Sequence, residues 1–498
     1  MGLARSAARL GSDDGRVAEN ARAYLVESMG ELRGLPQKIG QILSMGDSPE
    51  AQSFAPLTGE AKPLPFADIE AALETAWGRP WRDALKTLDP AGLAASLGQV
   101  HRGTLKSGEA VAVKVQYPGM AEAVQADLKL LGWLTAPVGG LRRGFDLPAY
   151  RDEILRDLGE ELDYRREAEQ QQRFAERAIP HVIVPRVYER LGTSRVLVTA
   201  WEDGAPLNTV AQNWNAAQRK SAARLFLVNA LDALFRHGEV QGDLHPGNFR
   251  FRLDAGGQVQ LVLFDFGCVF RPSESARLAL LRLIAITRAQ GDSDPFPYYL
   301  AMGFREDHLE PLARRLPALS RVLLDPFLLD GEYDPARWRL SERVSDVLGE
   351  DRWNFRVAGP ATLILLMRVM HGVLHALRTL DAPVSWSAPL RPILESAAPA
   401  MASLTLPRPE RPERGFGGMA RHLRLQIREG GEIKVRLTSP LHVVDNLQEA
   451  MGEDIAAKVR ARGIDLNGLA SRVRASGYVP QEIFLLRYGA KQVRVWLE

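Results

Sequence analysis

The chain has 498 residues, enough for about three domains at roughly 150 residues each. Its 63 lysines and arginines nearly balance 61 aspartates and glutamates, and the net charge of +2 argues against a protein that coats nucleic acid. Apolar residues make up 46% of the chain and charged residues 25%, which excludes a disordered, collagen-like or coiled-coil protein. The single cysteine, Cys268, excludes an internal disulfide and any multi-cysteine metal site, and it fits a reducing compartment.

The sequence shows no secretory signal and no run of about 20 uncharged apolar residues, so we expect that the chain does not span a membrane. The most apolar stretch, residues 360–377, contains Arg368, His371 and His375 and is predicted to be a buried core helix. The two histidines are spaced i, i+4, but no acidic third ligand lies near them in the sequence. We therefore expect a satisfied core pair, not a metal site.

The first elements in chain order are helical. Residues 1–46 and 66–88 have helical periodicity, and the Gly- and Pro-rich residues 47–65 between them indicate a loop. The pattern becomes strand-like at 95–117, where two β-rich runs flank a Ser-Gly turn and predict a hairpin. A charged helical stretch covers about 120–178, and strands return at 181–189 and 195–202.

From Leu207 the sequence is mostly helical to residue 400, interrupted by a loop, strand, turn, strand and loop at 242–267. Residues 406–418 have the composition of a linker. Beyond them, alternating residues on both sides of Gly430-Gly431 predict a second hairpin. The predicted segments are a helical N-terminal extension (1–90), a small β-rich lobe with a helical insert (91–204), a helical lobe (205–405), the linker, and a hairpin-plus-helix segment (419–498).

Four motifs whose residues could take part in catalysis follow one another in a characteristic order. Lys114 lies on a strand that reads Val-Ala-Val-Lys, Glu167 lies in a helical region, Asp243 and Asn248 share a loop, and Asp265-Phe266-Gly267 follows a strand. Each motif alone is common in ordinary strands and turns. Together, in this order, they indicate protein-kinase-like phosphoryl transfer.

Each residue type suits a step of that chemistry. Lys114 can bind the α and β phosphates of ATP, with Glu167 fixing the lysine side chain. Asn248 and Asp265 offer the oxygen ligands that Mg²⁺ prefers. Asp243 lies where a carboxylate would orient, or take a proton from, the attacking nucleophile.

The sequence also departs from ordinary protein kinases. No Gly-x-Gly-x-x-Gly precedes the strand lysine, and an alanine-rich turn at 93–101 stands in its place. Gln241 and Gly242 precede Asp243 where His-Arg is usual, and no Ala-Pro-Glu follows the Asp-Phe-Gly motif.

These departures carry a resemblance to the UbiB/AarF family of atypical kinases, over about residues 20–380. The matching segments are the family's KxGQ motif, its Ala-rich loop, the strand lysine, its ExD and EA segment, its HPGN loop and its DFG motif. They correspond to Lys38-Ile39-Gly40-Gln41, 94–101, Val113-Lys114, 161–168, 243–248 and Asp265-Phe266-Gly267.

The resemblance implies an α+β, bilobal protein-kinase-like fold with an N-terminal helical KxGQ extension and a small C-terminal α/β appendage. It places ATP against Ala94, Ala95 and Ser96, and adenine against the backbone at Ala200, where a glutamate is usual. It further implies that the KxGQ helix covers the active site as a regulatory element, in which Lys38, Gly40 and Gln41 face Glu161 and Asp163.

The function that this resemblance implies is an Mg-ATP-dependent atypical kinase or ATPase that supports isoprenoid-quinone or other lipid metabolism. Its partners would be a lipid or quinone precursor and quinone-biosynthesis enzymes, with no nucleic acid. The expected location is cytoplasmic, with peripheral contact at the inner face of the membrane as an open alternative. A nucleotide-binding scaffold that resembles a pseudokinase and a protein kinase also remain alternatives.

Overall fold

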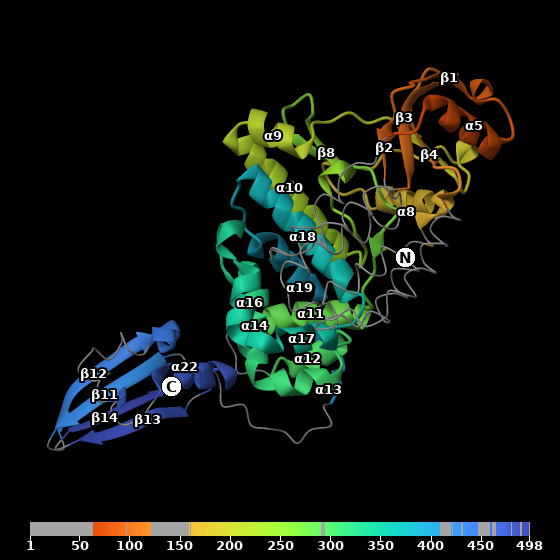
Figure 1. The fold of residues 1–498 in the computed structure, drawn as a ribbon. Helices are drawn as coiled ribbons and strands as arrows, with labels where there is room; N and C mark the ends of the chain where they lie inside the picture. The colour runs from red at the N-terminus through yellow and green to blue at the C-terminus, as the bar shows by residue number, and fades with distance from the viewer. Residues whose placement is uncertain are drawn as a thin grey trace, which may run out of the picture. The chain divides into compact units, whose positions relative to one another are not determined.

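The computed structural model describes two compact units, and Figure 1 draws the remaining residues in grey. The described residues are 63–95, 97–120, 159, 161–289, 294–408, 420, 422–429, 432–446, 459–460, 465–479, 481–488 and 491–497. The predictions for Lys38, Gly40, Gln41 and Ser96 lie outside these ranges. Among the described helices, none is long and apolar enough to cross a membrane.

The first unit takes in the described parts of Met1–Ser273, Gly331–Ala336 and Ala361–Pro389. Its five-stranded sheet is antiparallel, in the order β1-β3-β4-β6 with β2 paired to β3. The strands are β1 (Leu85–Leu88), β2 (Leu93–Ala94), β3 (Gly98–Leu105), β4 (Ala110–Gln116) and β6 (Val196–Ala200). The pairing of β3 with β4 confirms the first predicted hairpin.

Two helices flank this sheet, α5 (Phe66–Trp77) and α8 (Tyr164–Glu176). Ile69 and Leu73 of α5 are fully buried and pack with the inward-facing valines of β4, because alternate residues of a strand face one side. Both α5 and β1 precede residue 90, where the sequence placed the boundary of the lobe. They nevertheless belong to the same core and sheet as β3 and β4.

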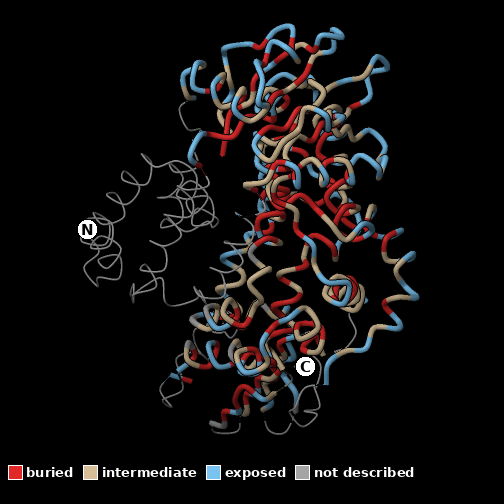
Figure 2. The backbone as a smooth tube through the Cα atoms, turned by 90° about the vertical axis from the view of Figure 1, so that its right-hand side faces the viewer, coloured by how far each residue is buried: buried red, intermediate tan, exposed pale blue. Residues whose placement is uncertain are grey.

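The other part of the first unit combines short strands with long helices (Figure 1), and Figure 2 colours the backbone by burial, with buried residues in red. The strands are β5 (Val182–Ile183), β7 (Val240–Gln241), β8 (Phe249–Leu253), β9 (Val259–Leu263) and β10 (Val269–Phe270). The helices are α9 (Leu207–Asn213), α10 (Ala216–Phe235) and α18 (Leu363–Leu380), with the short turn η5 (Pro246–Asn248). The turns η2 (Trp81–Asp83) and η4 (Glu189–Leu191) pack instead with the five-stranded sheet. The ring of Phe226 in α10 lies 4.5 Å from that of Phe249 in β8, so the long helix packs directly on the β8–β9 hairpin.

The second unit begins with a helical part. Its elements are α11 (Glu274–Arg288), α12 (Phe296–Ala301), α13 (Glu306–Leu309), η6 (Glu310–Arg315), α14 (Leu316–Leu323), α15 (Asp325–Leu328), α16 (Leu340–Leu348), η8 (Gly349–Asp351) and α17 (Arg352–Ala358). Tyr299, Phe304 and Phe355 form an aromatic cluster with ring centres 5.1 to 5.8 Å apart. The turn η7 (Pro335–Arg337) and the helix α19 (Ser387–Ser403) contribute residues to both units.

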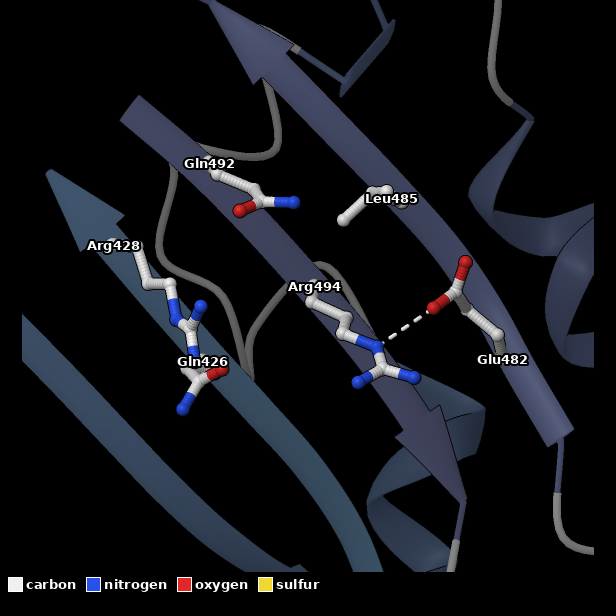
Figure 3. A pocket seen from close by; sticks show the side chains of 6 residues that line it. All are labelled: Gln426, Arg428, Glu482, Leu485, Gln492 and Arg494. Atoms are coloured by element: carbon white, nitrogen blue, oxygen red, sulfur yellow. Dashed lines mark hydrogen bonds and ion pairs between the residues drawn. The ribbon is translucent and has the colours of Figure 1, made fainter. Parts of the chain in front are cut away.

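The C-terminal part of the second unit is a four-stranded antiparallel sheet in the order β12-β11-β14-β13. It contains β11 (His422–Glu429), β12 (Glu432–Pro440), η9 (Leu441–Asn446), α22 (Leu466–Ala475), β13 (Gln481–Tyr488) and β14 (Lys491–Leu497). The pairing of β11 with β12 confirms the second predicted hairpin. One face of the sheet packs in a core with α22. Figure 3 shows a polar pocket on β11, β13 and β14, where Arg494 Nε donates a hydrogen bond to Glu482 at 2.7 Å.

Candidate functional site

Lys114 and Glu167 form the buried centre of the candidate site. Lys114 lies on β4, and its Nζ donates to both carboxylate oxygens of Glu167 on α8, at 2.7 and 2.8 Å. The Glu167 side chain is only 2% exposed and that of Lys114 is 15% exposed. A two-oxygen contact of this kind holds the amine in one position.

The electrostatics keep Lys114 charged despite its burial. Burial alone would lower the pKa of the amine, but the carboxylates of Asp265 and Glu167 reverse this and hold the pKa above its ordinary value. The Tyr164 ring lies 5.0 Å from Nζ and adds a cation–π contact. The site therefore presents a fixed positive charge, as binding of a polyphosphate requires.

Asp265 brings the third charged group to this centre. Its Oδ2 lies 3.7 Å from Lys114 Nζ, and its Oδ1 accepts a hydrogen bond from the Gly267 amide at 2.9 Å. The next residue, Phe266, is fully buried and packs against Phe174 of α8 with ring centres 5.0 Å apart. This packing links the Asp265 loop to the same helix that carries Glu167.

Asp243 and Asn248 lie in one loop, between β7 and β8. Asn248 Nδ2 donates to the Asp243 carbonyl at 3.0 Å, so the amide oxygen points away from that carbonyl. Asn248 also accepts, through its backbone oxygen, the amide of Phe264 directly before Asp265. The structure thus joins the two loops that hold the predicted metal ligands.

Two residues of this site were missed by the sequence analysis. Gln241 is buried and donates from Nε2 to the Asp265 carbonyl at 2.6 Å, so it ties the Asp243 loop to the Asp265 loop. Arg368 of α18 is 8% exposed and places Nη2 3.3 Å from Asp243 Oδ2. The one feature of the sequence that could have pointed to this contact is the presence of an arginine inside the apolar run 360–377, because an arginine is rarely buried without a partner.

The prediction of a core pair at His371 and His375 is wrong. Both residues are exposed on α18, whose buried side carries Val369, Val373 and Leu377. The histidines fall on the other side of the helix, since residues at i, i+4 share one face. Among the described residues no group of three or more His, Cys, Asp or Glu side chains is arranged so that it could hold a metal ion.

The alanine-rich turn forms a compact loop above β3. Ala94 pairs with Gln99, and the Ala95 amide donates to the Gly98 carbonyl at 2.8 Å. Position 98 has no room for a side chain, because a Cβ atom there would lie 2.3 Å from the Val115 carbonyl oxygen and 2.7 Å from the Tyr164 hydroxyl. The turn is therefore held against β4, the strand that carries Lys114.

The backbone at Ala200 is engaged within the protein. Its amide donates to the Arg186 carbonyl at 2.8 Å, so this donor is not open to an adenine ring. The following segment is tied to β8, because Ala205 and Phe251 exchange two backbone hydrogen bonds of 2.7 and 3.0 Å. Any adenine contact in this segment must use other groups than the Ala200 amide.

The two acidic residues predicted to face the KxGQ motif have different environments. Glu161 is 6% exposed, and a Cβ on Gly267 would lie 3.5 Å from its Cγ, so it borders the Asp265 loop. Asp163 caps α8, where its Oδ1 accepts from the Arg165 amide at 3.1 Å. Their proposed partner Lys38 lies outside the described residues.

Gly242 offers a sharp test of the packing between the two loops. A Cβ atom there would lie 2.6 Å from Cys268 Sγ, and the Gly242 amide donates to the Cys268 carbonyl. We expect Gly242→Ala to lower the free energy of unfolding by about 1–3 kcal/mol through overpacking. Adding Cys268→Ala should restore most of this loss. Urea denaturation of the four proteins measures it, and additive losses would contradict the predicted clash.

Chemically, the site combines a fixed cation, two candidate oxygen ligands for a divalent metal, and a carboxylate held by an arginine. Such an arrangement can bind a metal–polyphosphate and place a nucleophile near it.

The chain is similar to known proteins over the segment that holds Lys114, Glu167, Asp243 and Asp265. Residues 56–294 match the model of the ABC1 atypical kinase-like domain. The chain is 34% identical over 252 residues to the mitochondrial atypical kinase coq-8 of Caenorhabditis elegans, covering 49% of this chain and 33% of that protein. It is 30% identical over 342 residues to the mitochondrial atypical kinase COQ8B of Rattus norvegicus, covering 65% and 62%. The chain thus spans between one third and two thirds of these relatives.

A solved structure shares the fold. The Rv3197–erythromycin complex from Mycobacterium tuberculosis superposes with a TM-score of 0.54 at 28% identity, over 75% of this chain and 95% of that one. Together with the match to the ABC1 atypical kinase-like domain, this confirms the predicted kinase-like fold, in which helices and a small sheet are combined. Residues 56–294 are therefore similar to the ABC1 atypical kinase-like domain, and the relatives are atypical kinases of the UbiB/AarF type that the motifs of this chain resemble.

Proposed function

We propose that this protein is an Mg-ATP-dependent atypical kinase or ATPase. The observation that carries the proposal is the contact of Lys114 with both Glu167 and Asp265 from three separate elements. A structural ion pair needs only two partners, whereas here a second carboxylate lies on a loop that is joined to the Asp243–Asn248 loop.

The donor set fits Mg²⁺. Asp265 and Asn248 would hold the ion through carboxylate and amide oxygens, the hard ligands that Mg²⁺ favours. When bound, the ion would neutralise the charge of the phosphates during transfer. Lys114 would bind the phosphates directly, and the turn at Ala94 and Ala95 would lie over them.

Asp243 would orient the nucleophile. Its carboxylate is about 28% exposed, so one side is accessible while Arg368 holds Oδ2 on the other. A water molecule there gives hydrolysis, and a hydroxyl group gives transfer. Because the resemblance links the family to isoprenoid quinones, we propose a lipid or quinone precursor as acceptor and quinone-biosynthesis enzymes as partners at a membrane surface.

The test is phosphate release from ATP by the purified full-length chain, with Mg²⁺ and with EDTA. We expect Mg-dependent release, while tight Mg-ATP binding without release would favour the scaffold alternative. Mass spectrometry of lipids and quinones in a strain that lacks the gene then tests the substrate class. Unchanged quinones and polar lipids would contradict the metabolic assignment.

The proposed regulatory contact gives a separate prediction. Replacing Lys38 with alanine removes a positive charge that would pair with Glu161 and Asp163. We expect a changed preference between ADP and ATP, or a gain of autophosphorylation, with Glu161→Gln acting in the same direction. Unchanged hydrolysis, autophosphorylation and nucleotide affinity would show that Lys38 is an ordinary surface lysine, whose pairing contributes only about 0–1 kcal/mol.

A further inference from the structure

The helix α18 packs unusually closely on the Asp243 loop. A Cβ atom on Gly372 would lie 2.6 Å from Leu244 Cβ and 2.9 Å from the Leu244 carbonyl oxygen. Only a glycine allows the helix backbone to approach the loop at this point. Arg368 lies one turn earlier on the same face, since residues at i and i+4 are neighbours on a helix. The contact of Arg368 with Asp243 is therefore set by backbone packing.

The loop itself provides no cation beside Asp243. Ordinary protein kinases have an arginine directly before this aspartate, whereas this chain has Gly242. The structure leaves no room for a side chain there, because a Cβ would lie 2.6 Å from Cys268 Sγ. The positive charge next to Asp243 thus comes from α18, far along the chain.

We propose that Arg368 is a positioning residue that holds the Asp243 carboxylate for the nucleophile, an inference that rests on the proposed ATP-dependent function. A guanidinium keeps its charge at any physiological pH and offers donors in a fixed plane. With Nη2 3.3 Å from Oδ2, it restrains the rotation of the carboxylate and leaves Oδ1 for the nucleophile.

Its charge also offsets the repulsion between Asp243 and incoming phosphates. Arg368 is separate from the groups that would bind ATP, namely Lys114 and Asp265. Its loss should consequently lower turnover more than nucleotide affinity.

The experiment compares steady-state ATP hydrolysis by the full-length wild type with that of Arg368→Met and Arg368→Lys. We expect Arg368→Met to lower kcat about 10- to 100-fold, the range found when a supporting residue of a site is removed. The dissociation constant of Mg-ATP should stay within about twofold, and Arg368→Lys should recover part of kcat. Arg378→Met is the matched control, since Arg378 is an exposed arginine of the same helix that lies 3.5 Å from the Pro335 carbonyl.

Chemical rescue separates positioning from simple packing. Low concentrations of guanidinium should raise kcat of Arg368→Ala at least several-fold, whereas equal concentrations of urea should not. Turnover of Arg368→Met equal to wild type would overturn the proposal, and so would a loss of Mg-ATP affinity in parallel with kcat and without guanidinium rescue. Absence of Mg-dependent hydrolysis by wild type would instead contradict the proposed function on which this role rests.

Discussion

Replacing Asp265 with asparagine is expected to abolish the stabilisation of the protein by Mg-ATP. A neutral amide is a weaker Mg²⁺ ligand than a carboxylate, while its oxygen can still accept the Gly267 amide. At a ligand concentration 100 times the dissociation constant, wild type should gain about 2.7 kcal/mol, and the variant should gain almost none. Thermal unfolding with ATP, in Mg²⁺ and in EDTA, measures the difference.

Asp254→Asn is the matched control for this experiment. Asp254 lies in the turn between β8 and β9, and its Oδ1 likewise accepts backbone amides, from Gly256 and Gln258 at 2.9 Å. It should keep the full response to Mg-ATP. Equal stabilisation of the Asp265→Asn variant and of wild type would show that Asp265 is not a metal ligand.

The second large effect concerns the stability of the buried ion pair. Replacing Glu167 with leucine leaves the buried Lys114 with the more distant Asp265 as its carboxylate partner, and we expect a loss of about 3–5 kcal/mol in the free energy of unfolding. Replacing both residues, as Lys114→Met with Glu167→Leu, should recover most of this loss, because apolar side chains can fill the same space.

Urea denaturation of wild type, both single variants and the double variant measures this cycle. Glu167→Gln is a useful intermediate, since its amide oxygen can still accept a hydrogen bond from Lys114. A loss below about 0.5 kcal/mol in Glu167→Leu would contradict a tight buried pair, and the double variant should lack ATP hydrolysis whatever its stability.

For most charged residues of the site, the sequence predicts which strand, helix or loop carries them, because local residue patterns indicate those elements. Lys114 lies within an alternating strand, and Asp265 follows the apolar run that forms β9. Their contact could be inferred from the order of the motifs, although no pattern states a distance. The two hairpins could be predicted equally well. Turn residues stand at Lys106–Glu109 and at Gly430-Gly431, and apolar and polar residues alternate on both sides of each turn.

Other features depend on packing between distant segments and carry no local signal. Arg368 and His371 are both polar residues of α18. The arginine nevertheless contacts Asp243, whereas the histidine is exposed. Periodicity could not decide between these faces in a helix with apolar residues on several sides. Likewise, the sequence predicts a helix through residues 66–88, whereas Leu85–Leu88 form β1, because a strand of only four residues is too short to show alternation.

The measurement that tests the central claim most directly is equilibrium binding of a fluorescent ATP analogue to the purified full-length chain, with Mg²⁺ and with EDTA. The geometry of Lys114, Asp265 and Asn248 predicts saturable binding that Mg²⁺ strengthens at least about tenfold, a difference of about 1.4 kcal/mol. The Asp265→Asn variant should lose this Mg²⁺ dependence. Binding with the same affinity in EDTA, or no saturable binding at all, would contradict an Mg-ATP site at these residues.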